Sequence, residues 1–125
     1  MVYTSYFTKA SKLNPNDYIF ISIAQVTPSW FNHECLTYFP LQPNVKNLNL
    51  FKNGSMTQSE FAEKYEIQIL DELDPKEVWE DLYSLEKDVL ILCWEKLDNP
   101  KKFCHRTLVR NWLHKNLGLT VDELE

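Results

Sequence analysis

Two short apolar segments dominate the hydrophobic pattern of this chain. Residues 18–25 (YIFISIAQ) and 88–94 (DVLILCW) are rich in β-branched and aromatic residues and are apolar on both faces. Such segments are typical of strands in the middle of a covered sheet. Residues 2–7 (VYTSYF) form a weaker third strand candidate, and residues 119–122 form a short fourth one after a glycine.

Helical signals lie between these strands. Asp74 is a cap acid, a proline follows it in the first helical position, and Glu77 stands three residues after the cap. This arrangement predicts a helix over residues 75–86. A stripe of apolar residues predicts another helix over residues 57–73, with a break near Glu66.

A third helix is predicted near the end of the chain, where four apolar residues share one face: Val109, Trp112, Leu113 and Leu117. Gly118 ends this helix, because glycine readily adopts the left-handed conformation that follows a last helical turn. The opposite face is expected to hold Arg106, Arg110 and His114.

The alternation of strands and helices predicts an α/β fold. We expect a small, Rossmann-like layered domain spanning residues 1–125, with a mostly parallel central sheet flanked by helices on both faces. The polar, asparagine-rich stretch over residues 40–56 is expected to be an irregular connection, a loop rather than a lid.

The composition argues against several classes of function. The chain has 125 residues, a formal net charge of −5 and two arginines, so a basic surface for duplex nucleic acid is not expected. It has two glycines, Gly54 and Gly118, which cannot form a three-glycine dinucleotide motif or a P-loop. No cofactor is identified by the sequence.

Three cysteines at irregular spacing do not resemble a secreted disulfide framework. The first residues carry no basic segment followed by an apolar run, and the longest apolar run, over residues 89–94, is too short to span a membrane. We therefore expect free thiols in a cytoplasmic protein.

The candidate chemistry lies at the carboxyl ends of the strands, where α/β proteins gather ligands. Cys104 opens the last helix beside His105 and Arg106, and a helix start with cationic neighbours favours a thiolate nucleophile. The alternative is that Cys104 is a small apolar group in the core. Arg106 is a candidate anion ligand, or else the partner of Glu95 or another acid in an ion pair.

Other residues near these strand ends have weaker assignments. Cys93, Glu95, Cys104 and His105 are all chemically suited to zinc, but their spacing argues against it, because adjacent residues on a helix point about 100° apart. Trp30 is a candidate pocket wall or part of the core. Ser22 interrupts an apolar strand, and its hydroxyl is suited to a ligand or to a backbone carbonyl.

The segment over residues 60–88 is strongly acidic. It holds eleven acidic residues and three lysines, a net charge of −8. Most such segments keep a helix solvated, but an acidic helical surface can also dock on a basic partner protein.

Several stretches resemble the short bacterial and phage members of domain-of-unknown-function family 488. They are LCWEK at residues 92–96, FCHRTLV at 103–109 followed by Trp112 and Leu113, VYTSYF at 2–7, and ISIA at 21–24 leading to PSW at 28–30. Where family members often have a short proline-glycine turn, this chain has the longer LDNPKK at 97–102. The resemblance implies a small Rossmann-like α/β fold and does not supply a mechanism.

Two functional hypotheses follow. The first is a protein that binds a small anionic, nucleotide-like ligand at the strand ends, held by Arg106 and walled by Trp30, with Ser22 and Cys93 as further contacts. If it is an enzyme, it would cleave the ligand or transfer a group, with Cys104 as nucleophile or His105 as proton donor and Glu95 as base. The alternative is a non-enzymatic, phage-type inhibitor that uses its acidic helical surface on a basic host protein.

Overall fold

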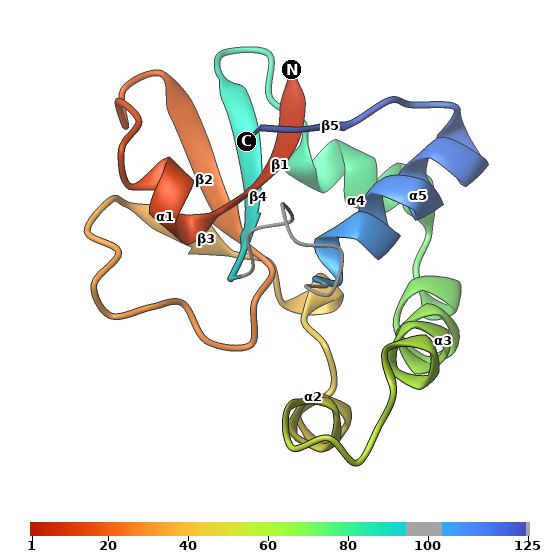
Figure 1. The fold of residues 1–125 in the computed structure, drawn as a ribbon. Coiled ribbons are helices and arrows are strands. Elements are labelled where there is room, and N and C mark those ends of the chain that lie inside the picture. The colour runs from red at the N-terminus through yellow and green to blue at the C-terminus, as the bar shows by residue number, and fades with distance from the viewer. Residues whose placement is uncertain (95–103, 125) are drawn as a thin grey trace.

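The protein is built on a five-stranded sheet in which every strand runs parallel to its neighbours. The computed structural model describes residues 1–94 and 104–124. The strand order is β3-β2-β4-β1-β5 (Figure 1). The strands are β1 (Val2–Tyr6), β2 (Tyr18–Ser22), β3 (Cys35–Thr37), β4 (Asp88–Cys93) and β5 (Asp122–Glu123). This confirms the predicted α/β fold with a parallel, Rossmann-like sheet.

Helices and short 3-10 turns connect the strands. They are α1 (Phe7–Ala10), η1 (Phe39–Leu41), α2 (Val45–Lys52), α3 (Gln58–Gln68), η2 (Leu70–Glu72), α4 (Pro75–Leu82) and α5 (Arg106–Leu117). The side chains of Asn44, Thr57 and Asp74 cap α2, α3 and α4 by accepting hydrogen bonds from backbone N–H groups of the first turn. Within the described residues, no helix is long and apolar enough to cross a membrane.

The sheet separates two hydrophobic clusters, and β4 contributes to both. Val89 and Ile91 point to the face covered by α4 and α5, whereas Leu90 and Leu92 point to the opposite face. The opposite face is covered by the one-turn helix α1 and by the loop that carries Phe31 (Figure 1). Helices therefore cover one face as predicted, whereas a short helix and a loop cover the other.

Three local expectations were wrong. β3 has three residues and no distinctive hydrophobic pattern, so it was missed. The segment over residues 40–56 is not irregular, since it contains α2 with an asparagine cap. The strand predicted over residues 119–122 is instead Asp122–Glu123, paired with β1. The helix expected over residues 57–73 is α3 followed by η2, close to the predicted break.

An internal ion pair attaches the last strand to the body of the protein. Arg106, on the first turn of α5, is completely buried and contacts both carboxylate oxygens of Glu123. Its Nη2 lies 2.9 Å from Oε2 of Glu123. The hydroxyl of Thr4 on β1 donates a 2.6 Å hydrogen bond to the same carboxylate. Three elements, β1, α5 and β5, therefore meet at one carboxylate.

We predict that Glu123→Gln destabilises the fold by about 3 kcal/mol, because removing one member of a buried ion pair leaves the other charge poorly compensated. Asp122→Asn changes the neighbouring, exposed residue of the same strand and should alter the free energy of unfolding by less than about 0.5 kcal/mol. Urea unfolding of both variants measures the difference. Equal stability of the two variants would show that the Arg106–Glu123 pair contributes little.

Candidate functional site

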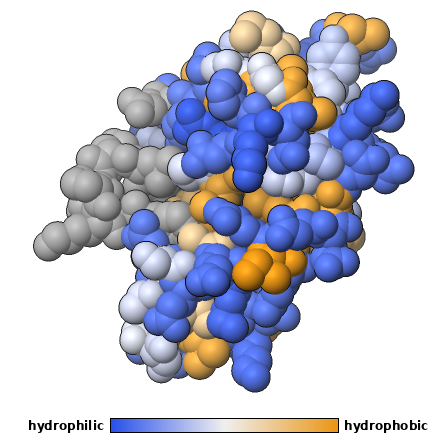
Figure 2. Space-filling view, turned by 90° about the vertical axis from the view of Figure 1, so that its right-hand side faces the viewer, coloured by the Kyte–Doolittle hydropathy of each residue, from blue (hydrophilic) through white to orange (hydrophobic). Residues whose placement is uncertain are grey.

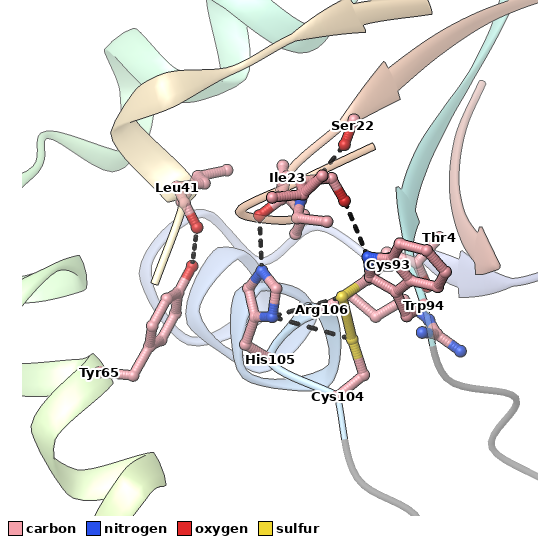
Figure 3. The surroundings of a disulfide bond; sticks show 12 residues. Thr4, Ser22, Ile23, Leu41, Tyr65, Cys93, Trp94, Cys104, His105 and Arg106 are labelled. Carbon is pink, nitrogen blue, oxygen red and sulfur yellow. Dashed lines mark hydrogen bonds between the residues drawn. A yellow bond between two sulfur atoms is a disulfide. The ribbon is translucent and has the colours of Figure 1, made fainter. Parts of the chain in front are cut away.

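A compact sulfur and imidazole cluster lies where β4 ends and α5 begins. Cys93, the last residue of β4, forms a disulfide with Cys104, which lies just before α5 (Figure 3). The next residue, His105, is the N-cap residue of α5 and points its ring at both sulfur atoms. Its Nδ1 atom is 3.4 Å from Sγ of Cys93 and 3.8 Å from Sγ of Cys104.

The hydrogen bonds assign the protonation state of His105. Its Nε2 atom lies 2.8 Å from the carbonyl oxygen of Ile23, which can only accept a hydrogen bond. Nε2 therefore carries the proton, and in the neutral ring Nδ1 is left with its lone pair directed at the two sulfur atoms. Burial lowers the pKa of His105 to about 4, with a smaller lowering contribution from the charge of Arg106 and an opposing one from the Ile23 hydrogen bond.

A mostly apolar cavity of about 460 Å³ opens beside this cluster. Ala24, Gln25 and Val26 line it after β2, and Trp94 follows β4. Cys93, Cys104 and His105 form one side of it. Pro43 and residues of α2 and α3 complete the lining. The residues from the two helices are Val45, Leu48, Asn49, Phe51, Lys52 and Phe61.

The cavity lies where the chain changes direction across the sheet. After β2 the chain moves to the edge strand β3, whereas after β4 it moves the other way to β5. When the connections from two adjacent parallel strands run in opposite directions, a crevice forms between them at the carboxyl ends of the strands. Ligands of α/β proteins bind in this crevice. The topology therefore places the cavity at the position expected for a binding site.

Reciprocal hydrogen bonds hold the cavity walls together. The amide of Gln25 donates to the carbonyl of Pro43 at 3.0 Å, and the amide of Gln42 donates to the carbonyl of Ala24 at 3.1 Å. The indole N–H of Trp94 donates to the carbonyl of Val26 at 2.8 Å. These bonds join the loop after β2 to the segment before α2 and to the end of β4.

Tyr65 of α3 braces the cluster from the helical side. Its ring centroid is 5.2 Å from that of His105, and its hydroxyl donates a 2.7 Å hydrogen bond to the carbonyl of Leu41 (Figure 3). Burial raises the pKa of this hydroxyl well above its ordinary value. Tyr65 therefore stays a neutral hydrogen-bond donor.

Two of the three cysteines do not match the expectation of free thiols. Cys93 and Cys104 are joined, so in this state Cys104 has no thiolate with which to attack a ligand. Cys35 is the free cysteine, and burial raises its pKa to about 11, which suppresses its thiolate at neutral pH. His105 is not suited to the predicted role of proton donor, because it is neutral and its N–H is bonded to Ile23.

Arg106 does not lie where a ligand-binding arginine was expected. Its side chain is buried against Glu123 and does not line the cavity, so the ion-pair alternative describes it, with Glu123 as a partner.

Trp30 is half exposed, packs edge-on against Phe31 and is not part of the cavity wall. Ser22 is buried and accepts a hydrogen bond from the N–H of Ala24, a structural role. Glu95 lies outside the described residues.

The sequence did not indicate the aromatic wall of the cavity. Phe51 on α2 and Phe61 on α3 stack with centroids 5.0 Å apart, and Trp94 follows β4. Phe51 belongs to a segment expected to be irregular, and Phe61 was assigned only to a helix stripe. The asparagine cap at Asn44, followed by apolar residues at helical spacing, was the available signal for α2.

Comparisons of the chain with protein-family models, with curated proteins and with solved structures found no match.

The buried, neutral His105 predicts a pH-dependent stability. Its pKa is about 4 in the folded protein and about 6.5 when exposed. Between these pH values the unfolded chain binds more protons than the folded protein. The contribution of His105 to the free energy of unfolding is therefore complete above about pH 6.5 and is lost as pH falls toward 4. The loss of stability should reach about 3 kcal/mol, because each pKa unit corresponds to about 1.4 kcal/mol.

Urea unfolding of the oxidised protein across this pH range measures the slope. In His105→Gln this part of the slope should disappear, whereas His114→Gln changes an exposed histidine and should keep it. A wild-type slope that survives in His105→Gln would contradict the assignment of a neutral His105.

Proposed function

We propose that this protein binds a small, nucleotide-like molecule in the cavity at the carboxyl ends of β2 and β4. The observation that carries the proposal is the position of this cavity at the direction change between those two strands. Its volume of about 460 Å³ is within the range of roughly 300–1,000 Å³ common for small-molecule sites.

The lining favours a ligand with a flat apolar part. Phe51, Phe61 and Trp94 present aromatic surface to the cavity, and aromatic rings stack well on planar groups such as a nucleobase. Gln25 and Asn49 add amide groups that can orient the ring edge by hydrogen bonds.

Lys52 supports the anionic part of the proposal. It lies at the last turn of α2, is exposed, and is the charged residue among those lining the cavity in the described part of the chain. An ammonium group there would attract a phosphate or carboxylate of the ligand. Lys52 thus takes the role that Arg106 was expected to have.

The proposed membership of domain-of-unknown-function family 488 rests on the sequence resemblance alone. The stretches that carry it include Cys93, Trp94, Cys104 and His105, which all line the cavity. The resemblance therefore draws attention to the same place as the cavity does, without naming a ligand.

Binding of adenosine monophosphate, measured by isothermal titration calorimetry, tests the proposal. Leu48→Trp adds a large ring from α2 into the cavity and should weaken binding by at least about tenfold, equivalent to about 1.4 kcal/mol. Lys52→Glu should weaken binding of adenosine monophosphate more than binding of uncharged adenosine, because only the former carries the phosphate.

Lys46→Glu is the matched control, because Lys46 is exposed on the same helix and does not line the cavity. It should bind like the wild type. Absence of measurable binding, or equal effects of Lys46→Glu and Lys52→Glu, would count against a nucleotide-like ligand in this cavity.

A second candidate is a docking function of the acidic helices. Ten of the eleven acidic side chains over residues 60–88 are exposed, on α3, η2, α4 and the segment after α4. Figure 2 shows a largely hydrophilic face interrupted by hydrophobic residues. A further cavity of about 300 Å³ lies between Leu70, Leu73 and Trp112, with Glu66 and Asp71 among the residues that line it. An acidic face of this kind suits a basic protein partner.

Polylysine is a simple probe of this surface. If the face acts as a docking site, binding should weaken with added salt and should fall when Glu77 and Glu80 of α4 are both changed to lysine. Binding of adenosine monophosphate should be unaffected by the same changes. A double variant that binds polylysine as the wild type does would argue against this surface.

A further inference from the structure

The Cys93, Cys104 and His105 cluster has the composition of a metal site. Their three potential ligand atoms, two sulfurs and Nδ1, all lie within 4.8 Å of one another. Cys104 and His105 do not both lie on a helix, because Cys104 precedes α5, so the separation of about 100° between adjacent helical residues does not apply to them. The backbone therefore does not hold the two side chains apart, and both converge on Cys93.

The two nitrogen-to-sulfur distances fit a tetrahedral centre, whereas the two sulfurs, bonded to each other in the disulfide, must separate on reduction. With Zn–S near 2.3 Å and Zn–N near 2.0 Å, a sulfur and a nitrogen on one zinc ion are about 3.6 Å apart. The two observed separations, 3.4 and 3.8 Å, lie on either side of that value. The Cα atoms of the two cysteines are 6.9 Å apart, just beyond the usual range of about 4.4–6.8 Å for disulfides. This spacing leaves room for two separated thiolates.

His105 is oriented as a metal ligand would be. Its Nε2–H donates to the carbonyl of Ile23, which fixes the ring and leaves the lone pair of Nδ1 facing the sulfurs. A metal-bound histidine commonly donates its other ring N–H to a carbonyl or a carboxylate in this way. The hydrogen bond that orients a metal-bound histidine is therefore already formed by His105.

Charge and access also suit a divalent cation. Two thiolates and a neutral imidazole bring a charge of −2, so a bound divalent cation makes the buried cluster neutral overall. The cluster lines the large cavity, from which an ion can enter and in which a fourth ligand can sit. Three protein ligands with one open position is the arrangement of catalytic zinc sites.

We propose that, in the reduced protein, Cys93, Cys104 and Nδ1 of His105 bind one zinc ion, with the fourth coordination position facing the cavity. A dithiol or phosphine reductant supplies the two electrons that break the disulfide, and two protons convert the sulfurs to thiols. Binding of the ion then releases these two protons as the thiolates coordinate. A small-molecule disulfide oxidant takes two electrons from the two zinc-bound thiolates and, with two protons, becomes a dithiol. The Cys93–Cys104 bond re-forms and the ion is released. This proposal does not rest on the nucleotide-like ligand, although the zinc ion would face the same cavity.

Cobalt and zinc are the probes for this site. The wild type is reduced with a phosphine without oxygen, and one equivalent of Co²⁺ is added. We expect thiolate-to-cobalt charge-transfer absorption in the near ultraviolet and the visible bands of tetrahedral cobalt. Native mass spectrometry with Zn²⁺ should show a gain of one zinc less two hydrogens. The same protein with its disulfide intact should show neither signal.

The variants separate the cluster from other thiols. Cys35→Ser removes the free cysteine and should behave as the wild type. Cys104→Ser and His105→Gln should each lower zinc affinity by more than the 10- to 100-fold typical of losing an outer-shell partner. Circular dichroism follows folding throughout, and if reduction unfolds the protein, zinc should restore the fold.

Three results would overturn the proposal. They are a reduced, folded wild type without the cobalt absorption, a signal lost in Cys35→Ser, or a reduced and unfolded protein that zinc does not refold. Binding of adenosine monophosphate to the oxidised protein is measured separately, so failure of the metal site leaves the cavity proposal open to its own test.

Discussion

The position of β4 is the constraint on which the rest of the structure depends. β4 forms backbone hydrogen bonds with β1 on one side and with β2 on the other, and it is apolar on both faces. A strand held in this way cannot shift its register by one residue without moving its side chains to the wrong face. Its last residue, Cys93, is therefore fixed, and with it the place where Cys104 and His105 must meet it.

The buried polar groups of this region are neutralised in different ways. Arg106 is paired with Glu123, His105 is kept neutral, and two sulfurs are joined. Each arrangement avoids an uncompensated charge in a medium of low dielectric constant. As a consequence, in the oxidised state Cys93 and Cys104 offer the cavity no thiolate, and the ring N–H of His105 is bonded to Ile23.

Much of the fold was predictable from sequence, because side chains buried in the core recur at regular spacings along each strand and helix. β2 and β4 are mostly apolar, β1 has a weaker pattern of β-branched and aromatic residues, α4 begins at a capping acid and a proline, and Gly118 ends α5. β3 and β5 were missed or misplaced because strands of three and two residues carry too few positions for a periodicity to be read.

The site was less predictable, because its chemistry depends on pairings between distant residues. The location of Cys104 and His105 at the strand ends was anticipated, but the partners of Cys104 and Arg106 were not. The charge of Arg106 suggests the polar face of the helix, whereas its spacing of three from Val109 and seven from Leu113 puts it on the buried face. The buried partner, Glu123, stands 17 residues away, so the sequence around Arg106 does not reveal it.

One wall of the cavity is formed by α2, the least buried helix of the described residues. None of the residues of α2 is fully buried, and its contacts include the ring stacking of Phe51 on Phe61 and a 2.9 Å hydrogen bond from Asn47 to Gln68. Its connection to the sheet is reinforced by the Gln25 and Gln42 bonds at its amino end. A wall with so little buried surface is the part of a fold that opens at the lowest free energy. Ligand access to the sulfur cluster is therefore expected to depend on α2, whereas the cluster itself is held by β4 and α5.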